Sequence, residues 1–120
     1  TLKFVDDTNL SLAGTKTKTF VVGSTADLRD GTNLVTTAHN VLVLTDTVAN
    51  VQTALWTTIN GGAKADVGNG VIVVAAETDK DAKVWYDASS ATGDETELMT
   101  LTGVSLTDLA NFNTDNFLIA

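Results

Sequence analysis

Four aspartates in two neighbouring turns are the residues whose type and spacing best suit a chemical role. They are Asp79, Asp81, Asp87 and Asp94. Carboxylate oxygens are the ligands that Ca²⁺ prefers, since this ion takes about six to eight oxygen atoms. Lys80 and Lys83 lie among them, and their positive charge weakens the attraction for a cation. We therefore expect solvated turn tips and no required cofactor, with calcium at these aspartates as the alternative.

Catalytic chemistry has little support in the sequence. His39 is the single histidine, and without a paired carboxylate or nucleophile it forms neither a triad nor a metal site. No phosphate-binding loop, dinucleotide fingerprint or nucleophile elbow occurs. We therefore expect no catalytic residues and a protein that is not an enzyme.

Three aromatic residues offer a binding alternative. Trp85 and Tyr86 are adjacent in a predicted strand, so their side chains point to opposite faces. One is expected in the core, and the other could join Trp56 on a surface that stacks against a sugar. A carbohydrate-binding module is thus an alternative, and it needs more than one exposed aromatic side chain on one face.

Charge and composition exclude several classes of protein. The 120 residues carry 15 Asp and Glu against 7 Lys and Arg, for a net charge of −8. A field of this sign repels phosphate groups, so we expect no nucleic-acid binding and no docking on anionic membranes. No apolar run approaches the roughly 20 residues of a membrane-spanning helix, so we expect no membrane insertion. Without cysteine, disulfides and thiolate metal sites are excluded.

Hydrophobic periodicity predicts the helices that position these residues. Apolar residues recur at helical spacing between about 47 and 60, which predicts the main helix. Its apolar face consists of Val48, Val51, Leu55 and Ile59. Asp46 and Thr47 are its predicted caps, and Gly61 with Gly62 ends it. A shorter helix is predicted at about 105–110, with Ser105 as its N-cap.

Strands make up most of the remaining pattern. They are predicted at residues 15–22, 41–44, 71–76, 83–87, 98–102 and 117–120. The three strands between 71 and 102 are joined by short polar turns, which predicts an antiparallel meander. We therefore expect one domain over residues 1–120 with an α+β, mostly β fold. Its sheet is expected to be largely antiparallel, with the main helix and the short helix on a face.

The segment 115–120 combines an acidic residue with an apolar run. It consists of Asp115, Asn116, Phe117, Leu118, Ile119 and Ala120. An acidic residue followed by a few apolar residues at the end of the chain resembles the terminal motif of type I secretion substrates. The first residues show no basic segment followed by an apolar run, so we expect no N-terminal signal peptide, as in those proteins. The resemblance implies that this segment is a secretion signal read by a type I secretion apparatus.

Two further motifs extend the resemblance over residues 41–120. One is the turn Tyr86-Asp87-Ala88 after a strand, and the other is the Leu-Thr-Gly-Val-Ser-Leu run from Leu101 to Leu106. With the main helix and the strands between them, they resemble the C-terminal domain of hemolysin-type (RTX-like) secreted surface proteins, which include adhesins and S-layer-like proteins. The glycine-rich calcium repeats that usually precede such domains are missing.

The resemblance implies a C-terminal, export-signal-bearing domain of an extracellular or cell-surface bacterial protein. A self-assembling surface-layer or filament subunit is an alternative. In that case the apolar segments 2–5 or 117–120 would pair with strands of another chain, because added-strand pairing makes a specific joint. The partners expected are thus the type I apparatus and, in the alternative, other copies of the chain.

Overall fold

The structure is a computed structural model that describes residues 1–4, 20–27, 41–59, 70–89, 91 and 93–119. His39, Gly61, Gly62 and Ala120 lie outside the described residues, as does most of the predicted strand 15–22. No helix among the described residues is long and apolar enough to cross a membrane.

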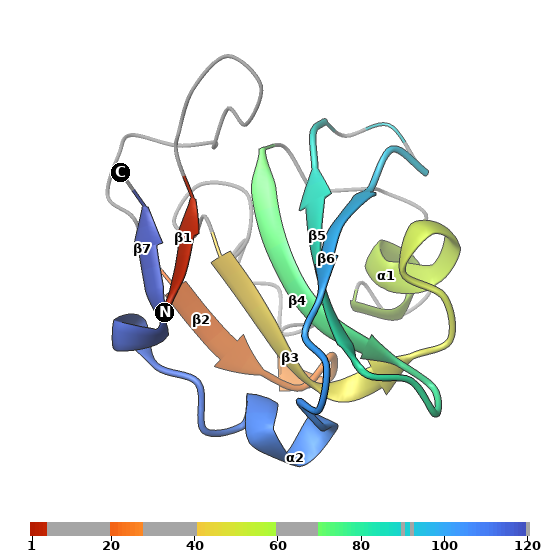
Figure 1. Cartoon of the computed structure of the whole chain (residues 1–120). Coiled ribbons are helices and arrows are strands. Elements are labelled where there is room, and N and C mark those ends of the chain that lie inside the picture. The colour runs from red at the N-terminus through yellow and green to blue at the C-terminus, as the bar shows by residue number, and fades with distance from the viewer. Residues whose placement is uncertain (5–19, 28–40, 60–69, 90, 92, 120) are drawn as a thin grey trace.

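Five strands form the main sheet, in the order β2-β3-β4-β5-β6 (Figure 1). They are β2 (Phe20–Gly23), β3 (Val41–Val48), β4 (Val71–Glu77), β5 (Ala82–Asp87) and β6 (Thr96–Thr100). The expected α+β, mostly β class is confirmed, and β4, β5 and β6 form the expected antiparallel meander.

Strand direction in the first half differs from the largely antiparallel expectation. Both β2–β3 and β3–β4 are parallel pairs. For β3 and β4 the cause is the helix α1 (Val51–Ile59), which lies between them in the chain, and such a crossover returns the second strand in the same direction. Residues 41–44 and 71–77 are buried throughout, as strands covered on both faces are.

The start of α1 also differs from the prediction of a helix at 47–60. β3 continues through Val48, so Asp46 and Thr47 lie in a strand and do not cap the helix. Asn50 takes the capping role, because its side-chain oxygen accepts the backbone N–H of Thr53 at 3.0 Å. Val48 is buried as expected, but from β3.

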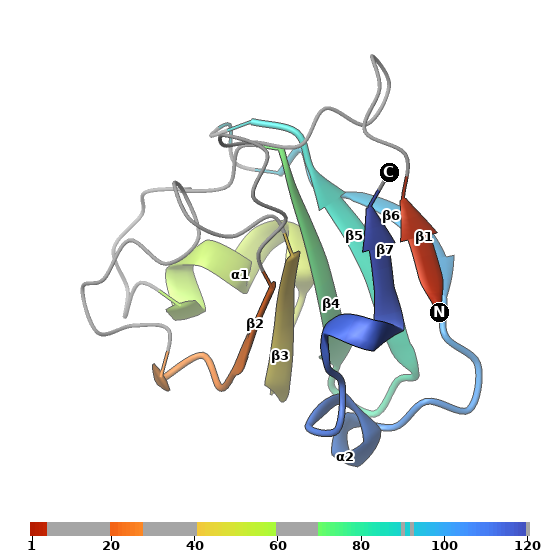
Figure 2. The same cartoon turned by 90° about the vertical axis from the view of Figure 1, so that its left-hand side faces the viewer.

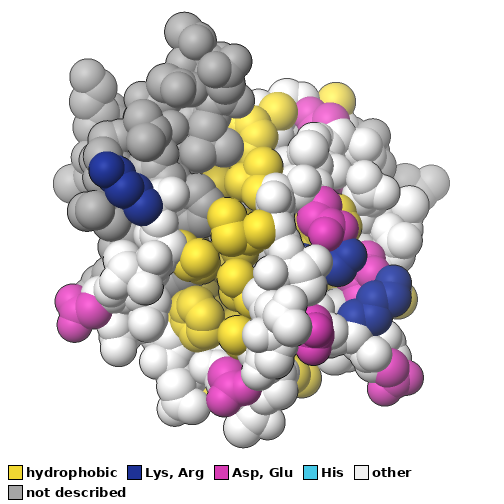
Figure 3. Space-filling view, viewed as in Figure 1, with side chains coloured by type: hydrophobic (Ala, Val, Ile, Leu, Met, Phe, Trp, Pro, Cys, Tyr) yellow, Lys and Arg dark blue, Asp and Glu magenta, His cyan; other side chains and the backbone are white. Residues whose placement is uncertain are grey.

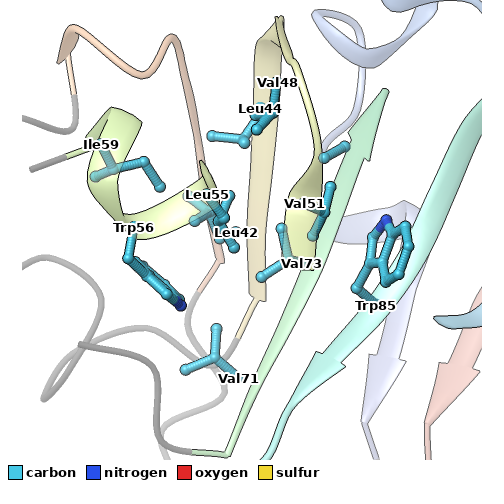
Figure 4. Close-up of a cluster of buried hydrophobic side chains, with 11 residues drawn as sticks. Leu42, Leu44, Val48, Val51, Leu55, Trp56, Ile59, Val71, Val73 and Trp85 are labelled. Carbon is cyan, nitrogen blue, oxygen red and sulfur yellow. The ribbon is translucent and has the colours of Figure 1, made fainter. Parts of the chain in front are cut away.

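Three layers result, with the five-stranded sheet in the middle (Figure 2). Helix α1 covers one face. The other face carries the short helix α2 (Leu106–Leu109) and a separate pair of strands, β1 (Leu2–Phe4) and β7 (Phe117–Ile119). Each face of the sheet has its own apolar core. We call the core under α1 the helix-side core, and it contains Leu42, Leu44, Val48, Val51, Leu55, Trp56, Ile59, Val71, Val73, Ala75 and Trp85 (Figure 4).

The core on the opposite face is less fully covered. Its buried members are Val41, Val43, Ile72, Val74, Ala76, Ala82, Val84 and Leu109. Partly buried apolar side chains pack around them, among them Leu2, Tyr86 and Leu101. Figure 3 shows hydrophobic side chains as a stripe down the middle of this face. The five-stranded sheet is therefore sealed by α1 on one side and only partly screened on the other.

Candidate functional site

The structure divides the four candidate calcium ligands into two pairs. Asp79 and Asp81 are exposed in the turn between β4 and β5, where Asp79 has a positive φ of 60°. Asp87 lies at the other end of β5, opposite Val71, and Asp94 lies just before β6. Among the described residues no group of three or more His, Cys, Asp or Glu side chains is placed to hold a metal ion. Calcium at these positions stays an untested alternative.

Asp87 is a buried anchor for α1. Its side chain is fully buried, and Oδ2 accepts a hydrogen bond from the Trp56 indole Nε1 at 2.6 Å. Figure 4 shows Trp56 reaching from α1 toward Val71, which stands opposite Asp87 on β4. A buried indole N–H without an acceptor would cost free energy, and Asp87 supplies that acceptor. This bond therefore ties the middle of α1 to the end of β5.

The turn after β5 is fastened to the same helix. The Gln52 side-chain amide on α1 donates to the backbone C=O of Glu95 at 3.0 Å, and Glu95 is 2% exposed. Within the turn, the Ser89 hydroxyl donates to Asp94 Oδ2 at 2.7 Å. The backbone of Glu95 therefore ties this turn to α1, and the Asp94 carboxylate holds the turn itself together.

A second carboxylate anchors the N-terminus of α1. Glu77, at the end of β4, is 6% exposed, and its Oε1 accepts the backbone N–H of Val51 at 3.1 Å. Its Oε2 accepts a bond from Lys80 Nζ at 2.6 Å. The Lys80 bond is the main cause that holds the pKa of Glu77 below its usual value, and the Val51 N–H adds to it. Sequence reasoning missed Glu77 because its partner lies 26 positions away.

Asp46, the predicted helix cap, joins two strand ends instead. Its carboxylate accepts the Thr25 backbone N–H at 2.8 Å and the Thr25 hydroxyl at 2.5 Å. Thr25 is itself buried, with 5% exposure, so the bond satisfies polar groups just beyond β2 that water does not reach.

The aromatic residues do not form an open platform. Trp56 and Trp85 are 4% and 5% exposed and lie in the helix-side core. Tyr86 points to the opposite face of the sheet, as strand alternation predicts. It is partly buried there and packs against the core on the face that α1 does not cover. Lys83 Nζ lies 5.7 Å from the centroid of the Trp85 ring. The sugar-binding alternative therefore lacks the exposed pair of aromatics that it requires from these residues.

The Leu101–Leu106 motif builds the connection from β6 to α2. The Leu101 N–H donates to the Ala82 C=O at 2.8 Å, and the Ala82 N–H donates to the Val104 C=O at 3.1 Å. Gly103 has a φ of 77°, where a side chain would be strained. Ser105 caps α2 as predicted. Its hydroxyl and N–H both donate to Asp108 Oδ2, at 2.6 and 2.8 Å, and these bonds lower the pKa of Asp108.

The candidate signal segment lies outside the main sheet. A 3-10 turn over Thr114–Asn116 leads into β7, which pairs in parallel with β1 through three residue pairs. Asp115 is exposed, and its backbone C=O accepts a bond from the Thr1 hydroxyl at 3.3 Å. This strand is not part of the main sheet, because β1 is its partner and the two form a sheet of their own.

No protein-family model, curated protein or solved structure matches this chain.

Proposed function

We propose that this chain is the export-signal-bearing module of an extracellular bacterial surface protein that a type I apparatus secretes. In this proposal the segment Asp115–Ala120 is the signal, and the rest of the chain is a folded structural module. The acidic residue followed by apolar residues is the sequence basis, together with the Tyr86-Asp87-Ala88 turn and the Leu101–Leu106 run.

The observation that carries the proposal is the place of the signal segment in the fold. Residues 117–119 pair only with β1 among the described strands. The parallel and antiparallel ladders from β2 to β6 do not include them. An exporter can therefore read the segment unpaired, and the segment can close onto β1 after the module has folded, without any change in the main sheet.

The use of three carboxylates, two buried and one half-buried, supports a structural module. Asp46 bonds to Thr25, Glu77 to the start of α1, and Asp87 to Trp56. Each of these bonds satisfies a donor that belongs to the scaffold. The alternative of a filament joined by terminal strands gains no such support, because β1 and β7 pair with each other in one chain.

The test is secretion of the full chain from a Gram-negative host that expresses a type I exporter. The variant Phe117→Ser/Leu118→Ser/Ile119→Ser should stay in the cells. The matched control is Leu98→Ser/Met99→Ser, which removes exposed apolar side chains elsewhere and should reach the medium like the wild type. Equal amounts of the signal variant and the wild type in the medium would refute the proposal.

A further inference from the structure

β6 is an open edge of the main sheet. It pairs with β5 on one side, and no described strand lies on its other side. All five of its residues are exposed. Leu98 and Met99, at 39% and 38% exposure, are the exposed large hydrophobic residues of the described chain. An edge with unpaired N–H and C=O groups and apolar side chains is a template for another strand.

The charges that usually protect such an edge are already paired within the chain. Glu97 is the charged residue of β6, and its Oε2 accepts a bond from Lys83 Nζ at 2.7 Å. Its Oε1 accepts a bond from the Thr100 hydroxyl at 3.2 Å. A strand that approaches β6 therefore meets a balanced ion pair in place of a free charge.

The hydrogen bonds to β5 show which backbone groups of β6 are available. The Leu101 N–H donates to the Ala82 C=O, and Thr100 stands opposite Lys83 in the antiparallel ladder. Because neighbouring residues in such a ladder alternate in direction, the N–H and C=O of Thr100 point away from β5. These groups are the first that an added strand would use.

We propose that β6 pairs with β6 of a second copy of this chain, in antiparallel orientation about a two-fold axis perpendicular to the sheet. Such an axis places helix α1 of both copies on the same face of the joined sheet. Glu97 stands opposite Trp85 and Thr100 opposite Lys83, and Lys83 and Trp85 share a face. Glu97 and Thr100 therefore point to one face, and in the register that we propose Glu97 of one copy stands opposite Thr100 of the other.

This register is self-complementary. Leu98 then lies opposite Met99 of the second copy, so the two exposed apolar residues cover each other, and no like charges face one another across the strands. The register shift between the Val84 and Trp85 pairings, which makes Leu98 an extra residue, is what places Glu97 and Thr100 on the same face. A two-fold contact uses the same patch on both copies and closes, so the product is a dimer and not a filament.

The contact between the two β6 strands is small, and the two negatively charged chains repel each other. These two properties determine the protein and salt concentrations of the test. An interface below about 1,200 Å² is at the weak end for protein complexes, so the chain must be studied up to about 1 mM. Each copy carries a charge of −8. Added salt screens this repulsion, so the dimer fraction should rise with ionic strength.

Sedimentation equilibrium of the wild type should show a mass that rises with concentration from 12.5 kDa toward twice that value. Met99→Lys should remain monomeric, because it places like charges at the axis. Thr100→Pro should also remain monomeric, because proline lacks the outward N–H but leaves the ladder to β5 intact. The control Thr107→Lys adds the same charge on an exposed position of α2 and should dimerise.

A wild type that stays at 12.5 kDa at every concentration and salt level would overturn the proposal. So would a Thr100→Pro variant that is folded by circular dichroism and dimerises like the wild type. The register has its own test, because the chain has no cysteine. Oxidation of an equimolar mixture of Leu98→Cys and Met99→Cys chains should yield more cross-linked dimer than either chain alone, and equal yields would refute the register.

Discussion

Glu77 offers the sharpest test of how the fold holds α1. The variant Glu77→Gln keeps the size of the side chain and an oxygen that can accept the Val51 N–H. It removes the charge that strengthens this bond at 3.1 Å and the ion pair with Lys80 at 2.6 Å. Any loss of stability in this variant therefore comes from the lost negative charge, through its contacts with the helix N-terminus and with Lys80, and not from a cavity.

The magnitude follows from the burial of the two partners. A carboxylate at a helix N-terminus contributes about 0.3–1 kcal/mol when exposed and up to about 2 kcal/mol when partly buried, and Glu77 is buried. The Lys80 side chain is 58% exposed, so its ion pair adds at most about 1 kcal/mol. We expect Glu77→Gln to lower the free energy of unfolding by about 2 kcal/mol, and Lys80→Met by under about 1 kcal/mol.

Urea unfolding followed by tryptophan fluorescence measures both losses, because Trp56 and Trp85 lie in the helix-side core. The pH dependence gives an independent check. The folded-state pKa of Glu77 is lowered, so its contribution is present above the unfolded-state pKa and is lost as the pH falls through the folded-state value. Glu77→Gln should therefore lose less stability than the wild type on acidification below about pH 4.3. A loss under about 0.5 kcal/mol at pH 7, below the effect of a buried charge–dipole contact, would refute the reasoning.

Three further predictions concern the core and the turns. Leu55→Ala should cost about 2–5 kcal/mol in urea unfolding, since Leu55 is 1% exposed under α1, and a cost under about 0.5 kcal/mol would contradict its place in the core. Trp56→Phe should cost more than Trp85→Phe in the same assay, because Trp56 Nε1 bonds to Asp87 whereas Trp85 Nε1 has no hydrogen-bond partner within the described chain; equal costs would contradict this. Calcium should leave the melting temperature unchanged, and a rise that EDTA reverses would show that the acidic turns bind the ion.

Elements with a strong local pattern could be predicted from the sequence. Val51, Leu55 and Ile59 are buried on α1 as their spacing indicates, and Ser105 caps α2 through Asp108. Both signals lie within one or two helical turns, where the chemistry of neighbouring residues determines the structure. The antiparallel meander could be predicted equally well, because short polar turns force neighbouring strands to reverse.

The contacts between segments that are distant in the sequence could not be predicted from local patterns. The role of Glu77 depends on Val51, and the burial of Trp56 depends on Asp87, 31 positions away. Asp46 resembles a helix cap in sequence, but Thr25 competes for its carboxylate and β3 continues past it. The partner of β7 is β1, at the opposite end of the described chain. Nothing local in either segment specifies that pairing.

The parallel pairing of β1 with β7 has a mechanical consequence. Figure 1 shows the start of β1 and the end of β7 at opposite ends of this small sheet. A force that pulls Thr1 one way and Ile119 the other slides the two strands past each other along their length. All three residue pairs then bear the load together, in shear, and do not separate one after another. A force applied between Thr1 and Ile119 would thus load the small sheet before it loads the main sheet.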